Sequence, residues 1–387
     1  LYAATGTPIH SMTPLSKIIW FGKHNKTLFS KAAKWISIKE YIWHQLFDVY
    51  EVDVSVAAAA GLLNLHTLQW HAAALTLCGI TKEQLSTVVA VDFLRKHVKP
   101  AVAHKLGIAG EVPFCMGSTD GCLSNVGSHA LAPGIAALTI GTSGAIRVAT
   151  NKPVLSYPAM PFNYPLDRQT FICGGPINNG GNTVHWALKK MQQQTHPTEK
   201  DYETFYGAIE QIPAGSDGLL CLPYLIGERA PVWDAKSSGV FVGVNNQHTE
   251  PHFFRAALEG VCFALNEVMQ MVEGATGNIK TIHVSGGFIR AEVWLQMLAD
   301  ITGKTLCITS NRDASATGAA LVGMKAIGMI QDYSEVPMAE EGCIQPNRQK
   351  HEWYNRFFKL YQTIYPALKD TMHGLHALQQ EKGTPSS

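Results

Sequence analysis

One carboxylate stands out in this sequence because small residues surround it. Asp120 lies in the segment 117–121 (GSTDG), directly after the short apolar run 112–116, which favours a strand. Small neighbours let a substrate approach the carboxylate, which could then accept a proton from an attacking hydroxyl group. The same pattern is also typical of a turn or a helix N-cap, where aspartate accepts hydrogen bonds from backbone N–H groups. Both interpretations of Asp120 stay open at this point.

A second feature is a turn of small residues between two apolar runs. Within residues 135–150 (IAALTIGTSGAIRVAT), positions 141–144 read Gly-Thr-Ser-Gly. Such a turn can direct backbone N–H groups at an anion the size of a phosphate, although it is also an ordinary hairpin connection. A general base followed by a phosphate-sized turn predicts phosphoryl transfer.

A further glycine turn follows a predicted strand later in the chain. Residues 281–285 favour a strand, Gly286 and Gly287 a turn, and residues 292–301 a helix. The amides of this turn and the helix N-terminus could receive a nucleotide. The two glycines could equally serve only close packing between strand and helix.

The elements that must position these residues fall into two parts. A chain of 387 residues exceeds what one hydrophobic core usually serves, so we expect two domains with a cleft between them. Residues 1–132 favour mainly helices, including one over 82–98, whereas strands and helices alternate within 133–375, as in an α/β domain. We expect residues 376–387 to form a disordered tail.

Composition excludes several classes of function. Charged residues make up 16% of the chain and the net charge is +1, which argues against nucleic acid or an anionic membrane surface as partners. The sequence contains no apolar run of the roughly 18 residues that a membrane helix needs, and its start carries no signal-peptide pattern. We therefore expect a cytoplasmic protein whose partners are small molecules.

Histidine and cysteine patterns predict no metal ligands. The sixteen histidines include no H-E-x-x-H motif and no closely paired His/Cys set. The eight cysteines include no C-x-x-C pair, and most lie in apolar runs. We expect all eight to be reduced residues of the core, as is usual in the cytosol.

Two longer motifs resemble those of a known family. Residues 12–24 (MTPLSKIIWFGKH) resemble the first signature of the FGGY carbohydrate kinases, and residues 239–259 resemble the second, with the spacing that the family uses. The resemblance covers nearly the whole chain. It implies an α/β, two-domain actin-like or ribonuclease-H-type ATPase fold that closes over a sugar and ATP, with Mg²⁺.

The same resemblance implies roles for individual residues. Asp120 matches the general base that accepts the proton of the sugar hydroxyl, and His10 and Met12 match a segment that faces the sugar. The positions that border the nucleotide are Gly141, Thr142, Gly181, His185, Gly286 and Gly287. Structural alternatives stay open, since His185 could pack beside the ring of Trp186 and Met12 could fill the core.

Within the family, two phrases are similar to the branch that acts on gluconate. They are GTPIHSM at residues 6–12 and GGPINNGG at residues 174–181. The resemblance thus implies ATP-dependent phosphorylation of D-gluconate to 6-phosphogluconate. A xylulose kinase-like pentulose kinase and a non-catalytic sugar-binding relative stay open as alternatives, and so does a homodimer. Retention of Asp120 argues against a protein that only binds sugar, because binding alone needs no base.

One part of the family's pattern is not found in the sequence. Family members begin with a strand and an Asp-x-Gly-Thr hairpin that binds ATP phosphates and metal, and this sequence, which starts at Leu1, contains no such segment. We therefore expect the first domain to be incomplete. We also expect the chain by itself to be poorly soluble and nearly inactive.

Overall fold

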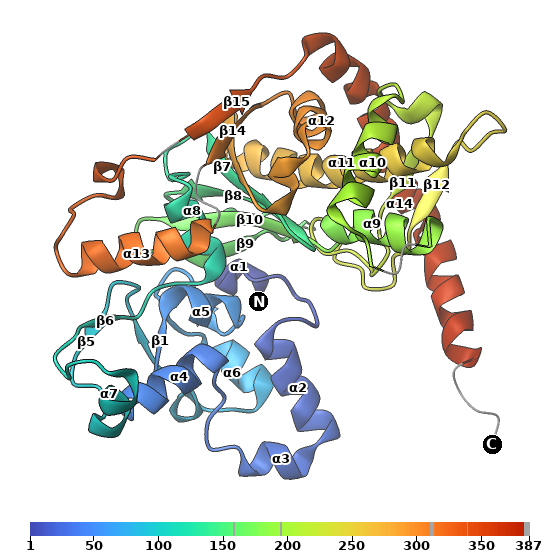
Figure 1. Ribbon diagram of the computed structural model, residues 1–387. Helices are drawn as coiled ribbons and strands as arrows, with labels where there is room; N and C mark the ends of the chain where they lie inside the picture. The colour runs from blue at the N-terminus through green and yellow to red at the C-terminus, as the bar shows by residue number, and fades with distance from the viewer. Residues whose placement is uncertain (158, 194–195, 310–312, 339, 383–387) are drawn as a thin grey trace. The chain divides into compact units, whose positions relative to one another are not determined.

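The computed structural model describes residues 1–157, 159–193, 196–309, 313–338 and 340–382 (Figure 1). The chain divides into two compact units that interleave along the sequence. Unit 1 comprises residues 1–135, 147–174 and 313–339, and unit 2 comprises residues 136–146, 175–312 and 340–387. A division into consecutive domains, 1–132 and 133–375, stays a prediction.

Unit 1 is mainly helical. Its α-helices are α1 (Tyr2–Thr5), α2 (Pro14–His24), α3 (Lys26–Lys31), α4 (Ile38–Phe47), α5 (Val54–Ala59), α6 (Ala72–Cys78), α7 (Pro100–Leu106), α8 (Asp120–Gly127) and α13 (Ala314–Ala326). The hydroxyl of Thr13 caps α2 by accepting a hydrogen bond from the Ser16 N–H, and Pro14 takes the first helical position, where no N–H is needed. Ser37 and Glu40 form a capping box at the start of α4. Local sequence thus sets where these helices begin.

Short strand pairs complete the first part of unit 1. β1 (Glu51–Asp53) pairs in parallel with β4 (Thr87–Val89), while β2 (Leu63–Asn64) pairs antiparallel with β3 (Gln69–Trp70), and β5 (Leu94–Arg95) with β6 (Phe114–Cys115). The helix predicted over 82–98 is therefore wrong. That segment holds the 3-10 turn Lys82–Gln84, β4 and β5, because the run Thr-Val-Val is β-branched and suits pairing with β1.

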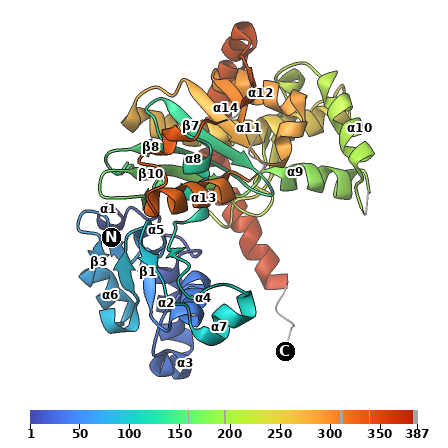
Figure 2. The ribbon, with the colours of Figure 1, turned by 60° about the vertical axis from the view of Figure 1, so that its left-hand side comes forward.

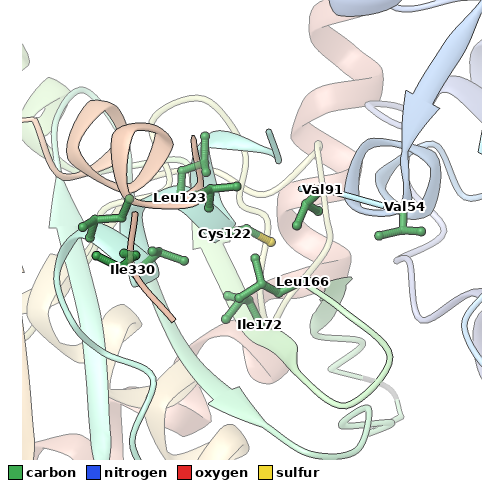
Figure 3. Packing of buried hydrophobic residues seen from close by; sticks show 10 residues of the cluster. Val54, Val91, Cys122, Leu123, Leu166, Ile172 and Ile330 are labelled. Atoms are coloured by element: carbon green, nitrogen blue, oxygen red, sulfur yellow. The ribbon is translucent and has the colours of Figure 1, made fainter. Parts of the chain in front are cut away.

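A packed core of unit 1 holds the helix that starts at Asp120. α8 packs against α13, and both ribbon views show the two helices side by side (Figures 1 and 2). The buried residues of this core are Val54, Val91, Cys122, Leu123, Val126, Leu166, Ile172, Leu321, Val322 and Ile330. Figure 3 shows Cys122 and Leu123 of α8 among Leu166, Ile172 and Ile330. Apolar packing therefore fixes the position of α8 within unit 1.

Unit 2 is built on a mixed sheet. Its strands run in the order β15 (Glu340–Ile344), β14 (Thr305–Thr309), β13 (Thr281–Ser285), β7 (Ile135–Ile140), β8 (Gly144–Thr150) and β10 (Phe171–Ile177). β13 and β14 are parallel and are connected by α12 (Glu292–Thr302), whereas β15 is antiparallel to β14. Residues 147–150 of β8 and 171–174 of β10 belong to unit 1, and there β10 pairs with β9 (Phe162–Pro165). The predicted α/β character is confirmed.

Unit 2 also contains two long helices, α11 (Glu250–Thr276) and α14 (Arg348–Lys382). α11 packs against α10 (Glu199–Glu210), α12 and β11 (Leu220–Leu222), and β11 pairs with β12 (Val240–Val242). α14 contradicts the predicted disorder for residues 376–382, because this stretch (HALQQEK) consists mostly of good helix formers that extend the helix. Residues 383–387 of that tail lie outside the described residues. No helix in the described part of the chain is long and apolar enough to cross a membrane.

Two cysteines form a disulfide, so the prediction that all eight are reduced is wrong. Cys307 in β14 and Cys343 in β15 lie opposite each other in the antiparallel register, with their Cα atoms 4.1 Å apart. The pairing of two strands brings them together, which no spacing in the sequence indicates. The free cysteines are Cys78, Cys115, Cys122, Cys173, Cys221 and Cys262, and all but Cys115 are buried.

Candidate active site

Asp120 is the first residue of α8, and its side chain is exposed. The preceding residue, Thr119, is the helix N-cap, and its hydroxyl accepts a hydrogen bond from the Cys122 N–H at 3.3 Å. One carboxylate oxygen of Asp120 accepts a hydrogen bond from the Gly121 N–H at 2.7 Å. The interpretation of Asp120 as the N-cap is therefore wrong, and its exposed carboxylate can meet a substrate hydroxyl.

A buried network fixes the segment that precedes this carboxylate. Asp53, at 0% exposure, accepts hydrogen bonds from the Ser55 hydroxyl and from the Ser55 N–H, the latter at 2.9 Å. The Ser55 oxygen accepts hydrogen bonds from the Ser118 hydroxyl at 2.7 Å and from the Thr119 N–H at 2.8 Å. Lys39 Nζ forms an ion pair with Asp53 at 2.5 Å, which compensates the buried charge. Sequence reasoning missed this network because its members lie far apart along the chain.

His10 and Met12 lie in the turn that precedes α2. The Met12 N–H donates to His10 Nδ1 at 3.3 Å, and the His10 carbonyl accepts a hydrogen bond from the Thr13 hydroxyl at 2.9 Å. His10 is half-buried, while Met12 is 38% exposed and therefore does not fill the core. Contact of the two side chains with a sugar stays a prediction.

Unit 2 contains a pocket of about 770 Å³, a volume that suits a nucleotide. Five of the six positions predicted to border a nucleotide line this pocket, namely Gly141, Thr142, Gly181, His185 and Gly287. The remaining lining residues, which sequence reasoning missed, are Ile140, Asn182, Val184, Glu199, Tyr202, Glu203, Tyr206, Phe288, Arg290, Ala291 and Trp294. The fold of unit 2 thus gathers residues from four separate stretches of sequence, 140–142, 181–185, 199–206 and 287–294, into one pocket.

Two glycine-rich segments form one side of the pocket by packing backbone on backbone. Gly181 begins α9 (Gly181–Trp186), and its N–H donates to the Gly141 carbonyl at 2.7 Å. A Cβ on Gly181 would lie 2.7 Å from that same carbonyl oxygen, so a larger residue does not fit without movement. The Gly141 N–H donates to the Ser143 carbonyl at 2.9 Å and is thus used within the turn. The exposed Thr142 hydroxyl is therefore the better placed group of this turn for an anion.

Gly286 lies beside the pocket lining rather than in it. Its φ is +103°, and a Cβ at this position would lie 2.4 Å from the Ile140 carbonyl oxygen. Close packing against β7 explains why this residue is glycine. The next residue, Gly287, begins a 3-10 turn (Gly287–Arg290) and lines the pocket.

Aromatic rings form another side of the pocket. The ring of Tyr206, on α10, lies 6.4 Å from that of Trp294 on α12, and the ring of Phe288 lies 5.6 Å from Trp294. Burial raises the pKa of Tyr206 well above its usual value, so its hydroxyl is neutral. Flat rings suit a nucleobase, as the glycine turns suit phosphates. Tyr202 and Tyr206 are four residues apart on one helix, a spacing that could have indicated a shared face.

The sequence matches two domains of one family. Residues 1–127 match the N-terminal domain of the FGGY family of carbohydrate kinases, and residues 136–327 match the C-terminal domain of the same family. The N-terminal domain of the family is therefore present in this chain, and the two signatures noted above lie in the order that the family has.

Relatives of known name agree with these matches. Gluconokinase from Bacillus subtilis (strain 168) is 41% identical over 342 residues, which cover 87% of this chain and 67% of that protein. Gluconokinase from Bacillus licheniformis is 38% identical, covering 96% of this chain and 74% of that protein. Xylulose kinase from Bacillus subtilis (strain 168) is 27% identical, covering 95% of this chain and 73% of that protein.

Solved structures extend the similarity to the fold. Gluconate kinase from Lactobacillus acidophilus and ligand-bound xylulose kinase from the same organism each give a TM-score of 0.91 at 34% identity, covering 97% of this chain and 76% of the other. The predicted two-domain sugar-kinase fold is thus confirmed. On the evidence of its domains, its relatives and its fold, the chain belongs to the FGGY family of carbohydrate kinases.

Proposed function

We propose that this protein catalyses the ATP-dependent phosphorylation of D-gluconate to 6-phosphogluconate. The observation that carries the proposal is the graded identity, 38–41% with two gluconokinases against 27% with a xylulose kinase that aligns over a similar share of the chain. The phrases GTPIHSM and GGPINNGG favour the same substrate.

We assign the role of general base to Asp120. The attacking hydroxyl of gluconate donates its proton to this carboxylate while its oxygen bonds to the γ-phosphorus of ATP and ADP leaves. Phosphoryl transfer depends mostly on alignment and charge neutralisation, so the base must be held in place. The exposure of Asp120 and the buried hydrogen bonds of Ser118 and Thr119 beside it support this role.

The pocket of unit 2 fits ATP. Its volume of about 770 Å³ admits a nucleotide, its aromatic side suits adenine, and Thr142 and the adjoining glycines suit the phosphates. Mg²⁺ would neutralise charge on those phosphates. Among the residues that the structure describes, no group of three or more His, Cys, Asp and Glu side chains could hold a metal ion. We therefore infer that the phosphates of the nucleotide and water supply most ligands of Mg²⁺, as is usual for this ion.

A pentulose kinase is the second candidate. The xylulose kinase structure from Lactobacillus acidophilus matches this chain with the same TM-score and identity as the gluconate kinase structure, which favours keeping xylulose in the comparison. A substrate panel separates the two functions. With ATP and Mg²⁺, we expect kcat/KM to be higher for gluconate than for xylulose, ribulose or glycerol. A panel led by xylulose would make this protein a pentulose kinase, and sugar binding without ADP release would make it a non-catalytic relative.

A further inference from the structure

Arg147 is a half-buried cation beside the helix that carries the candidate base. It lies on β8 between the buried Ile146 and Val148. Its guanidinium group packs against the first turn of α8, where a Cβ on Gly121 would lie 2.9 Å from Arg147 Nε and 3.1 Å from Cζ. Because Gly121 directly follows Asp120, the positive group packs against the same first turn of α8 that carries the carboxylate we assign as the base. The absence of a side chain at position 121 provides the room that the guanidinium occupies.

The Arg147 side chain makes neither a hydrogen bond nor an ion pair within the part of the chain that the structure describes, although its backbone carbonyl accepts a hydrogen bond from Asn125. Other arginines that are removed from solvent are paired. Arg95 forms an ion pair with Glu51 at 2.5 Å, and Arg255 forms one with Glu259 at 2.9 Å. No nitrogen of Arg147 is among the buried side-chain atoms that lack a partner in the described part of the chain, so its unused donors reach solvent and are open to an anion. Arg147 is therefore a ready binding group for an anion beside the first turn of α8.

The substrate itself can supply that anion. Gluconate differs from a neutral sugar by the carboxylate at C1, at the opposite end of the carbon chain from the C6 hydroxyl that Asp120 would deprotonate. A guanidinium at that end of the substrate can donate two parallel hydrogen bonds to the carboxylate. We propose that Arg147 binds the carboxylate of the sugar acid and so determines the preference for acids over neutral sugars. This inference rests on the proposed function, because it requires an acidic substrate.

The test compares D-gluconate with D-gluconamide, which keeps the carbon chain and the hydroxyl groups but carries no charge. In the wild type, we expect kcat/KM to favour gluconate by roughly 10- to 100-fold, the range given by a hydrogen bond to a charged group. Arg147→Met should lose about this factor for gluconate and change little for gluconamide. Arg147→Lys should fall between the two, because lysine keeps the charge but lacks the planar fork.

Binding measurements without turnover give a second readout. By calorimetry, Arg147→Met should lose affinity for gluconate and keep affinity for ATP, whose proposed pocket lies in unit 2. The matched control is Arg168→Met, which removes an exposed arginine of unit 1 and should change neither affinity nor kcat/KM. Thermal unfolding shows whether each variant is folded. If the methionine variant does not fold, the lysine variant carries the comparison.

Each outcome decides between distinct explanations. An equal loss on gluconate and gluconamide in Arg147→Met would assign the residue to the transferred phosphoryl group or to the fold, and would overturn the inference. An undiminished preference for gluconate in this variant would overturn it as well, while leaving the proposed function in place. A wild type that prefers xylulose to gluconate would refute the proposed function itself.

Discussion

Gly318 of α13 lies against the backbone of Leu123 in α8 so closely that a Cβ on Gly318 would lie 1.9 Å from the Leu123 carbonyl oxygen. The two helices therefore meet backbone to backbone at this point. On the same helix as Gly318, the hydroxyl of Ser315 donates to the backbone carbonyl of Asp120 at 3.1 Å, across 195 positions of sequence. The candidate base is thus held by a helix from a distant part of the chain.

Gly318→Ala should destabilise unit 1 and lower kcat. The added methyl group would meet a backbone carbonyl that cannot rotate away, so we expect the free energy of unfolding to fall by about 1–3 kcal/mol. Urea denaturation of the purified protein measures this change. The matched control is Gly323→Ala on the same helix, where a Cβ would meet nothing within 4 Å. That substitution should be neutral or stabilising by up to ~1 kcal/mol. Equal stability of the two variants would contradict the close approach of α8 and α13.

Ser55→Ala should reduce both stability and turnover, because the Ser55 hydroxyl joins buried Asp53 to Ser118 and Thr119. Its removal leaves buried polar groups without a partner, which costs about 1–3 kcal/mol. We expect kcat to fall while affinity for ATP stays unchanged. The control is Ser30→Ala, since the exposed Ser30 hydroxyl bonds only within its own helix. A Ser55→Ala enzyme with normal kcat would show that the network supports the fold but does not position the base.

Elements governed by local sequence could be predicted well. The strand expected over 281–285 is β13 with the same bounds, and the helix expected over 292–301 is α12, which ends one residue later at Thr302. In both cases the signals, apolar spacing and a neighbouring glycine turn, lie within a few residues of each other in the sequence. The segment 82–98 was predicted wrongly because β4 exists only through its pairing with β1, more than thirty positions earlier.

The residues of the candidate site fall into the same two groups, those with a local signal in the sequence and those without one. Small residues around Asp120 and Thr142 could be found from the sequence, because glycine and threonine at a turn carry a local signal. The Asp53–Ser55 network and the disulfide Cys307–Cys343 could not, because tertiary contacts alone bring those residues together. Arg147 belongs to the second group, since its unpaired state is visible only when its surroundings are known.

Glu267→Gln should change how stability depends on pH. Burial on α11, reinforced by Glu228, raises the pKa of Glu267 from 4.5 to about 7. Below pH 4.5 this carboxyl is protonated in both the folded and the unfolded chain. Between pH 4.5 and 7 the unfolded chain releases the proton while the folded chain retains it, so this group's contribution to stability is lost as the pH rises.

A glutamine at position 267 is neutral at every pH, so Glu267→Gln removes the loss of stability that the wild type undergoes as the pH rises. Relative to the difference at pH 4.5, we expect Glu267→Gln to gain up to about 3 kcal/mol over the wild type at pH 8, at 1.36 kcal/mol per pKa unit. Denaturant unfolding at both pH values measures the gain. Glu210→Gln, which alters an exposed glutamate of unit 2, is the control and should leave the pH dependence unchanged. If the difference in free energy of unfolding between Glu267→Gln and the wild type were the same at pH 4.5 and pH 8, the pKa of Glu267 in the folded chain would not be raised.

Asp120→Asn should remove nearly all phosphorylation of gluconate while leaving the fold intact. The amide oxygen can still accept the hydrogen bond from the Gly121 N–H, but the side chain can no longer take a proton from the attacking hydroxyl. We expect kcat to fall by about 10²–10⁴-fold, the usual contribution of a positioned general base. ATP affinity measured by calorimetry should be unchanged, because the pocket that we propose for ATP is lined by residues of unit 2. Asp92→Asn, at an exposed aspartate of unit 1, is the matched control and should keep normal kcat. Turnover near the wild-type level in Asp120→Asn would show that another group, or the phosphate itself, accepts the proton.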